Sequence, residues 1–349
     1  MNYTGESQSK PVKTPIADLF DFDNVDWYRQ FMLRLRYNID LKAYGNFAGI
    51  VANSLNQLQQ FKMIPPPDED FEQLNEWGRL MQTDGYADLG ELMSKQQRDD
   101  VFAYLEDKKV RYFWDRALEP FSPDSPPPNV SVGGYDRKDI MAAPHLHMLA
   151  NHPRVVGVAA RLLGVMPSLM ATSMWWSFPG RVEGEHAELF HIDRHCYRFC
   201  KLFIYLTDVD EDSGPHVYVR ATGNYGANYA HAAKKAAGNE DLLKRYNAIL
   251  GKQRKTDAEI EELFGAERVA VKTAPAGSAI LGNTGSIHKG QHPKTNRRLL
   301  FSALYTMLPT IKDPVDRMPA PDLVNQVHST YPGAYTDDQI CYLNRLVSR

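Results

Sequence analysis

The stretch ELFHIDRHCYRFCKLFIYL, residues 188–206, contains two short apolar segments that we predict to be strands, over 188–192 and 199–206. Turn residues such as Pro179-Gly180 and Ser213-Gly214-Pro215 separate these strands from others of the same kind. The other predicted strands cover residues 170–177, 217–219, 268–273, 278–281 and 299–307. Short strands without helices between them favour an antiparallel sandwich or barrel. We therefore expect a double-stranded β-helix core, which is a jelly-roll, cupin-like arrangement.

The chain before this core has helical patterns, so the expected fold class is α+β or mainly β. Predicted helices cover 17–61, 71–81, 94–108 and 153–163, with Ser94 as the N-cap of the third. A helical insert is predicted at 225–264, where Thr256 and Glu259 have capping-box spacing. The expected organisation is a disordered N-terminus (1–14), a mainly helical region packed on the core (15–165), the core with its insert (166–310) and a C-terminal extension (311–349).

The composition is ordinary for a globular protein. The 349 residues are 43% hydrophobic and 24% charged, with a net charge of −3. This balance gives no reason to expect nucleic-acid binding. The polar start, Met1 to Thr14, lacks an apolar signal region, and no apolar run is long enough for a membrane helix. Three cysteines do not form a disulfide framework, so we expect a cytoplasmic protein; the oligomeric state stays open.

Three residues have the pattern of a metal site. His191 and Asp193 are two apart, which places both side chains on one face of a strand. His288 follows 95 residues later (288 − 193) and can complete three ligands, because distant strands meet at the mouth of a jelly roll. Two imidazoles and one carboxylate leave three octahedral positions open. This donor set suits non-haem Fe(II), which must also bind a co-substrate and O2.

Arg297 and Arg298 follow the second histidine and offer a fork for a carboxylate, such as that of 2-oxoglutarate. On a strand the two side chains face opposite sides, so only one can enter the barrel. Lys201 is a charge within an apolar strand. It is expected to contact the co-substrate or substrate, or to reach solvent along its stem.

Two other classes of protein are also compatible with these residues. Zinc also accepts three protein ligands, and His195, Cys196 and Cys200 lie nearby, so a zinc-dependent hydrolase is one. The cysteines are more simply explained as buried small hydrophobes. A non-catalytic jelly-roll binding protein is another. We expect His145-Leu-His147 to be a loop or surface pair. The aromatic residues Trp175, Trp176, Tyr205 and Tyr218 are expected to be mainly core.

At these residues the chain resembles the phytanoyl-CoA dioxygenase family of Fe(II)/2-oxoglutarate oxygenases. The similar stretches are His191-Ile-Asp193, 201–215 with its terminal Gly-Pro, 282–290 and Arg297-Arg298, within roughly residues 80–310. The resemblance implies that His191, Asp193 and His288 bind iron and that Arg298, or else Arg297, binds 2-oxoglutarate.

The same resemblance implies an activity, with Fe(II), 2-oxoglutarate and O2 as cofactor and co-substrates. The expected reaction is hydroxylation of an unactivated C–H bond in a small metabolite or natural-product intermediate, with succinate and CO2 as co-products. Desaturation, cyclisation and epimerisation share its first step. Residues 219–224 and the insert that follows depart from the family, so the substrate pocket cannot be inferred from it.

Overall fold

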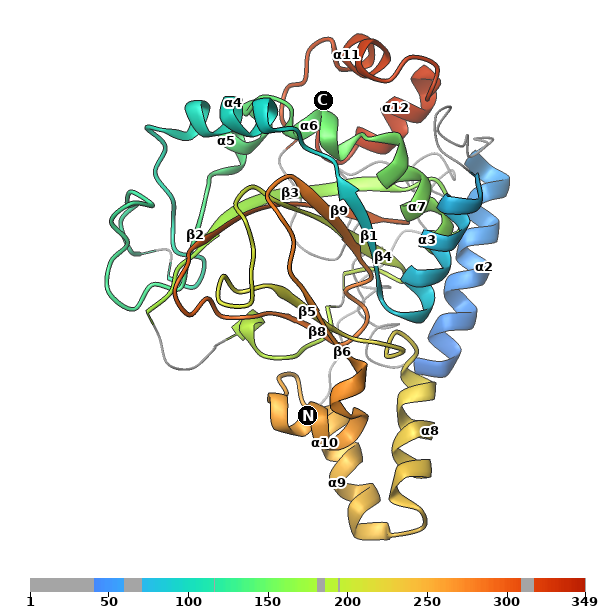
Figure 1. Cartoon of the computed structure of the whole chain (residues 1–349). Helices are drawn as coiled ribbons and strands as arrows, with labels where there is room; N and C mark the ends of the chain where they lie inside the picture. Colours follow the sequence, from blue (N-terminus) through green and yellow to red (C-terminus); the bar gives the residue numbers. More distant parts are fainter. Residues whose placement is uncertain are drawn as a thin grey trace, which may run out of the picture.

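Two antiparallel sheets lie face to face at the centre of the protein (Figure 1). The structure is a computed structural model that describes residues 41–59, 71–115, 117–180, 186–193, 195–308 and 317–348. The six-stranded sheet has the order β1 (Tyr86–Glu91), β7 (Ser278–Gly282), β4 (Phe199–Tyr205), β9 (Arg298–Thr306), β3 (Ser168–Ser177), β2 (Val132–Gly134). The three-stranded sheet has the order β6 (Val269–Lys272), β5 (His216–Val219), β8 (His288–Gly290). The neighbouring strands are distant in sequence, so residues far apart along the chain meet between the sheets.

Helices cover the outer face of the larger sheet (Figure 1). The central one, α7 (Pro153–Leu163), begins with a proline whose missing N–H costs nothing in the first turn, and it ends at Gly164 with φ 77°. Its apolar residues are buried against the sheet, and α3 (Phe71–Thr83) packs beside it. The remaining helices before and after the core are α2 (Leu41–Gln59), α4 (Lys95–Leu105), α5 (Arg137–Ala142), α6 (Leu146–Ala150), α11 (Leu323–Thr330) and α12 (Asp337–Asn344).

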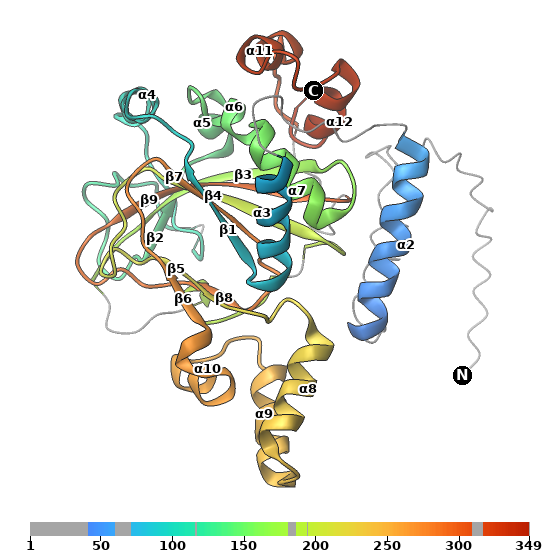
Figure 2. The same cartoon turned by 45° about the vertical axis from the view of Figure 1, so that its right-hand side comes forward.

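Three helices occupy the segment 225–264 and lie against the smaller sheet (Figure 2). They are α8 (Tyr225–Ala236), α9 (Glu240–Gly251) and α10 (Asp257–Phe264). Their buried residues, including Tyr246 and Phe264, form one cluster with Val217 and Val219 of β5 and with Phe190. The insert is therefore anchored on β5, which is paired with the strand of His288, and on Phe190, the residue before His191.

The space between the sheets is filled by aromatic and aliphatic side chains. Phe203 and Tyr205 of β4, Tyr218 of β5 and Leu300 of β9 belong to this interior cluster. Gly282 is required there, because a Cβ at this position would lie 2.2 Å from the hydroxyl oxygen of Tyr218. The interior is therefore closely packed at this position.

The predicted strands other than 188–192 are confirmed, and the ends of each lie within two residues of the predicted ends. Ser94 caps α4, and Thr256 caps α10, each in a complete capping box. The predicted strand 188–192 is wrong: a 3₁₀ turn covers His186–Glu188, and only isolated bridges follow at Phe190 and His191. His145 lies in the turn before α6 as its N-cap, in keeping with the expected loop position, whereas His147 lies within the helix. Both side chains are half-buried and each ring has a hydrogen-bond partner, Asp100 for His145 and Asn344 for His147.

Some expectations fall outside the described residues, namely the disordered N-terminus 1–14 and the first part of the helix over 17–61. In the portion of the chain that the structure describes, none of the helices combines the length and apolar character needed to cross a bilayer.

Candidate metal centre

Backbone pairing brings His191 and His288 together. The two residues form an isolated antiparallel bridge, in which the His191 N–H donates to the His288 carbonyl (2.8 Å) and the His288 N–H donates back (3.0 Å). The Asp193 N–H donates to the Thr284 carbonyl (2.8 Å), in the turn before β8. The strand β8 is itself paired with β5. All three candidate ligands are therefore held by main-chain hydrogen bonds and not by side-chain packing alone.

The three side chains converge. One ligand atom from each of His191, Asp193 and His288 lies within 4.8 Å of the others. The Nε2 atom of His191 is 3.7 Å from Oδ1 of Asp193, and Nε2 of His288 is 3.8 Å from Oδ2. In the chain segments described, this is the cluster of His, Cys, Asp and Glu side chains that could hold a metal ion.

The second nitrogen of each histidine is committed to the backbone. Nδ1 of His191 is 2.8 Å from the Leu189 carbonyl, and Nδ1 of His288 is 3.0 Å from the Ser286 carbonyl. A carbonyl can only accept, so each Nδ1 carries the proton and each Nε2 presents a lone pair to the centre. Metal-binding histidines are oriented in this way in many proteins.

The protonation states also suit a cation. Burial, with the adjacent His288, lowers the pKa of His191 to about 3, and burial lowers the pKa of His288. Burial alone would raise the pKa of Asp193, but Lys201 and the nearby histidines hold that pKa well below its usual range. At neutral pH the site therefore offers two neutral imidazoles and one carboxylate, the donor set that a divalent metal needs.

Lys201 has a definite partner. Its Nζ atom lies 2.6 Å from Oδ2 of Asp193, so the charge on β4 pairs with the candidate ligand and does not run out to solvent. His195 is also close, with Nε2 at 3.6 Å from the same oxygen. Sequence spacing did not reveal either contact, because both depend on how β4 packs beside the 191–193 segment.

The two arginines point in opposite directions at the start of β9, whose first residue is Arg298, as expected. Arg298 is 3% exposed; it donates from Nη2 to Ser177 Oγ (3.1 Å) and from Nη1 to the Gly214 carbonyl. Among the described residues it has no carboxylate partner within salt-bridge distance, and its buried Nε has no acceptor. Arg297 points outward, where it pairs with Asp124 (2.8 Å) and lies over the Trp176 ring.

His216 is a site residue that the sequence pattern did not single out. It begins β5 and is 4% exposed, with its ring 4.1 Å from that of Phe203 and Nδ1 3.4 Å from the Tyr205 hydroxyl. Its cross-strand partner is Gly290, and the Arg298 guanidinium lies near that glycine. Burial and the Arg298 charge keep the pKa of His216 well below its usual range, so the ring is neutral. His216 therefore lies in the interior between Arg298 and the candidate ligands.

The cysteines take no part in the cluster. Cys196 and Cys200 are fully buried, and burial raises the pKa of the Cys196 thiol to about 11. Neither thiol is among the side chains that converge at the candidate metal site. Of the four aromatic residues considered from the sequence, Trp176, Tyr205 and Tyr218 are buried and Trp175 is partly buried.

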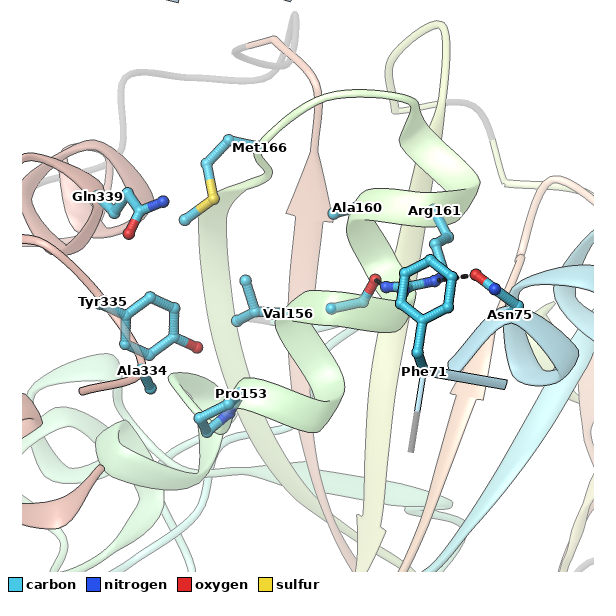
Figure 3. Close-up of a pocket in the computed structure, with 11 residues that line it drawn as sticks. Phe71, Asn75, Pro153, Val156, Ala160, Arg161, Met166, Ala334, Tyr335 and Gln339 are labelled. Carbon is cyan, nitrogen blue, oxygen red and sulfur yellow. Dashed lines mark hydrogen bonds between the residues drawn. The ribbon is translucent and has the colours of Figure 1, made fainter. Parts of the chain in front are cut away.

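A separate cavity of about 210 Å³ lies between α3, α7 and the C-terminal helices (Figure 3). Its lining is mainly apolar, including Val156, Met166 and Tyr335, and Arg161 at one side is bonded to Asn75. None of the three candidate ligands contributes to it, so it is not part of the metal centre.

No family model matches the chain, and no curated protein matches it. Among solved structures, it is similar to the non-heme alpha ketoglutarate dependent carbocyclase SnoK from nogalamycin biosynthesis. The identity is 14%, the match covers 70% of this chain and 87% of SnoK, and the TM-score is 0.44. HygX from Streptomyces hygroscopicus, solved with nickel and 2-oxoglutarate bound, is 18% identical over 72% of this chain and 92% of HygX, with a TM-score of 0.43.

The epimerase SnoN, also from nogalamycin biosynthesis, is 16% identical over 68% of this chain and 84% of SnoN, with a TM-score of 0.41. SnoN has also been solved with Fe3+, alpha ketoglutarate and nogalamycin RO, and HygX with iron. At these identities and TM-scores, the similarities assign neither a family nor an activity to this chain.

Proposed function

We propose that this protein is an Fe(II)- and 2-oxoglutarate-dependent dioxygenase. The observation that carries the proposal is the convergence of His191, Asp193 and His288 within 4.8 Å, each histidine with Nε2 free for a metal. Two neutral nitrogens and one carboxylate on one side of an ion leave positions for a bidentate co-substrate and for O2. When bound, the iron would supply the O2 chemistry that attacks a C–H bond.

Arg298 is the residue that we assign to 2-oxoglutarate. It is a buried guanidinium with no carboxylate within salt-bridge distance among the described residues, and Glu188 acts on it only from beyond that distance. A desolvated charge of this kind is costly until it is paired. The distal carboxylate of 2-oxoglutarate would pair with it while the keto-acid end reaches the metal. Ser177 and the Gly214 carbonyl hold the guanidinium in place. Arg297 is already paired at the surface and is the weaker candidate.

Other side chains have supporting roles in this proposal. Lys201 keeps Asp193 ionised through the 2.6 Å contact, so the carboxylate is ready to bind a cation. Phe203, Tyr205 and Tyr218 fill the interior and would exclude bulk water from the reacting atoms. His216 would lie beside the co-substrate, between Arg298 and the metal.

The finer assignments belong to the same proposal. The two sheets would be the halves of a jelly roll, because the chain passes back and forth between them: β4, β7 and β9 lie in the larger sheet, and β5, β6 and β8, which lie between them in sequence, form the smaller sheet. The motifs at 191–193, 201–215 and 282–298 support the phytanoyl-CoA dioxygenase family. The expected reaction is hydroxylation of a small metabolite or natural-product intermediate, with succinate and CO2 as co-products.

Anaerobic titration of the Fe(II)-loaded protein with 2-oxoglutarate tests the proposal. A saturable visible charge-transfer band is expected in the wild-type protein. Asp193→Ala and His288→Ala should lose Fe(II) binding and the band, whereas His328→Ala, at the surface beside Asp337, should keep both. A folded, iron-containing protein without the band would refute it. A zinc-dependent hydrolase or a binding protein would then be the better explanation.

A further inference from the structure

The helical insert returns to the metal centre through the segment between α9 and α10. There the Lys255 N–H donates to the Phe190 carbonyl (2.9 Å), and the Phe190 N–H donates to the Lys255 carbonyl (3.0 Å). This is an isolated antiparallel bridge. The segment 190–191 is bridged on one side to Lys255 of the insert and on the other side to His288. The insert segment therefore lies next to the segment that carries His191.

The register of this bridge places Arg254 opposite His191. In an antiparallel pair, a step forward on one segment matches a step back on the other, so 190 opposite 255 puts 191 opposite 254. Opposite residues project to the same face, and successive residues alternate. Phe190 and Lys255 are 1% and 2% exposed on the face toward the insert core. His191 and Arg254 therefore face the metal centre together.

The electrostatics agree with this placement. The charge of Arg254 contributes to lowering the pKa of His191, and Asp193 acts to raise the pKa of Arg254. Burial is the larger influence on Arg254 and lowers its pKa, so the guanidinium is partly desolvated. The side chain thus lies within electrostatic reach of two of the candidate ligands.

Arg254 differs from the cationic side chains around it, which are each paired with a carboxylate. Lys252 is bonded to Glu259, Arg245 to Glu262 and Lys289 to Asp257. Within the described parts of the chain Arg254 makes no side-chain hydrogen bond and no ion pair at salt-bridge distance, and the charge that acts on it is that of Asp193. At the centre itself, Asp193 is matched by Lys201. In the proposed function, Arg298 takes the distal carboxylate of 2-oxoglutarate, so that co-substrate does not neutralise Arg254.

We propose that Arg254 binds an anionic group of the substrate, a carboxylate or a phosphate, and so presents the neighbouring part of the substrate to the metal. The inference rests on the proposed function and narrows its substrate class to anionic small molecules. A guanidinium binds either group through paired N–H donors. The role also explains why the insert pairs with the segment that carries His191: the pairing places Arg254 beside the candidate ligands.

The test uses full-length protein loaded with one equivalent of Ni(II) and saturated with 2-oxoglutarate, so that it cannot turn over. Inorganic phosphate and acetate are titrated separately by calorimetry, to distinguish a phosphate from a carboxylate. Arg254→Gln should weaken binding of the preferred anion about tenfold or more, the effect of losing a charge-assisted hydrogen bond. Arg254→Lys should lose less. Arg245→Gln, in the same insert but paired with Glu262, should bind like wild type.

The outcomes separate this inference from the proposed function. Failure of the wild-type protein to bind 2-oxoglutarate would overturn both. Normal 2-oxoglutarate binding with equal anion affinities in wild type and Arg254→Gln, or no saturable anion binding in wild type, would overturn the inference alone. A tenfold loss of 2-oxoglutarate affinity in Arg254→Gln would also overturn it, because Arg254 would then serve the co-substrate.

Discussion

The choice between Arg298 and Arg297 gives the sharpest prediction about co-substrate binding. Arg298→Gln removes a guanidinium that is 3% exposed and faces the interior, whereas Arg297→Gln removes one that is paired with Asp124 at the surface. Losing one member of a buried charge pair costs about 2–4 kcal/mol, which corresponds to a roughly 30- to 1,000-fold weaker Kd for 2-oxoglutarate. Arg297→Gln should weaken the Kd for 2-oxoglutarate by about fivefold at most, because an exposed ion pair contributes little.

The assay is calorimetric titration of Ni(II)-loaded variants with 2-oxoglutarate, supported by thermal unfolding of each apoprotein. Arg298→Gln should fold well, because the unliganded protein has no carboxylate there to leave unpaired, and glutamine can still donate to Ser177 or Gly214. Weak binding by a folded Arg298→Gln protein therefore reports the lost carboxylate contact. A larger loss in Arg297→Gln than in Arg298→Gln would show that the outward arginine binds 2-oxoglutarate and would refute the assignment.

Three further predictions address the centre and the fold. Lys201→Met should raise the pH midpoint of Ni(II) binding, because Asp193 loses the ammonium at 2.6 Å; an unchanged midpoint would contradict this. Burial lowers the pKa of His152 to about 4 in the folded protein. The unfolded chain therefore takes up this proton first, and the folded protein loses stability as pH falls below about 6.5. Urea unfolding should then show wild type losing about 1–2 kcal/mol more than His152→Asn between pH 7 and pH 5. Ser94→Ala should lower the free energy of unfolding by about 1 kcal/mol through loss of the α4 cap, whereas no change would argue against the capping box.

Local sequence patterns predicted much of the fold. Helix α7 covers the predicted residues 153–163, Ser94 is the N-cap of α4, and the capping box predicted at Thr256 is present. Such signals work because helix periodicity and caps involve residues three or four apart. The 188–192 segment was predicted as a strand but is not one, because its partners bridge it at only single positions. A strand needs a continuous partner, and that is a property of the whole fold.

The candidate ligands were chosen from chemistry and spacing, and the structure brings all three together. Their surroundings could not be chosen in that way. Lys201 lies eight residues from Asp193 and His216 lies far from Arg298 in sequence, so no local pattern joins either pair. Their proximity follows from the order of strands in the two sheets.

The division between the two sources of information has a physical basis. Residue types and short spacings specify which side chains can bind a metal or a carboxylate, and which segments prefer helix or strand. Which arginine enters the interior, which cation meets Asp193 and which insert residue stands opposite His191 depend on strand register. A shift of one residue in register would turn each of these side chains to the other face, and register is set by contacts between segments distant in the chain.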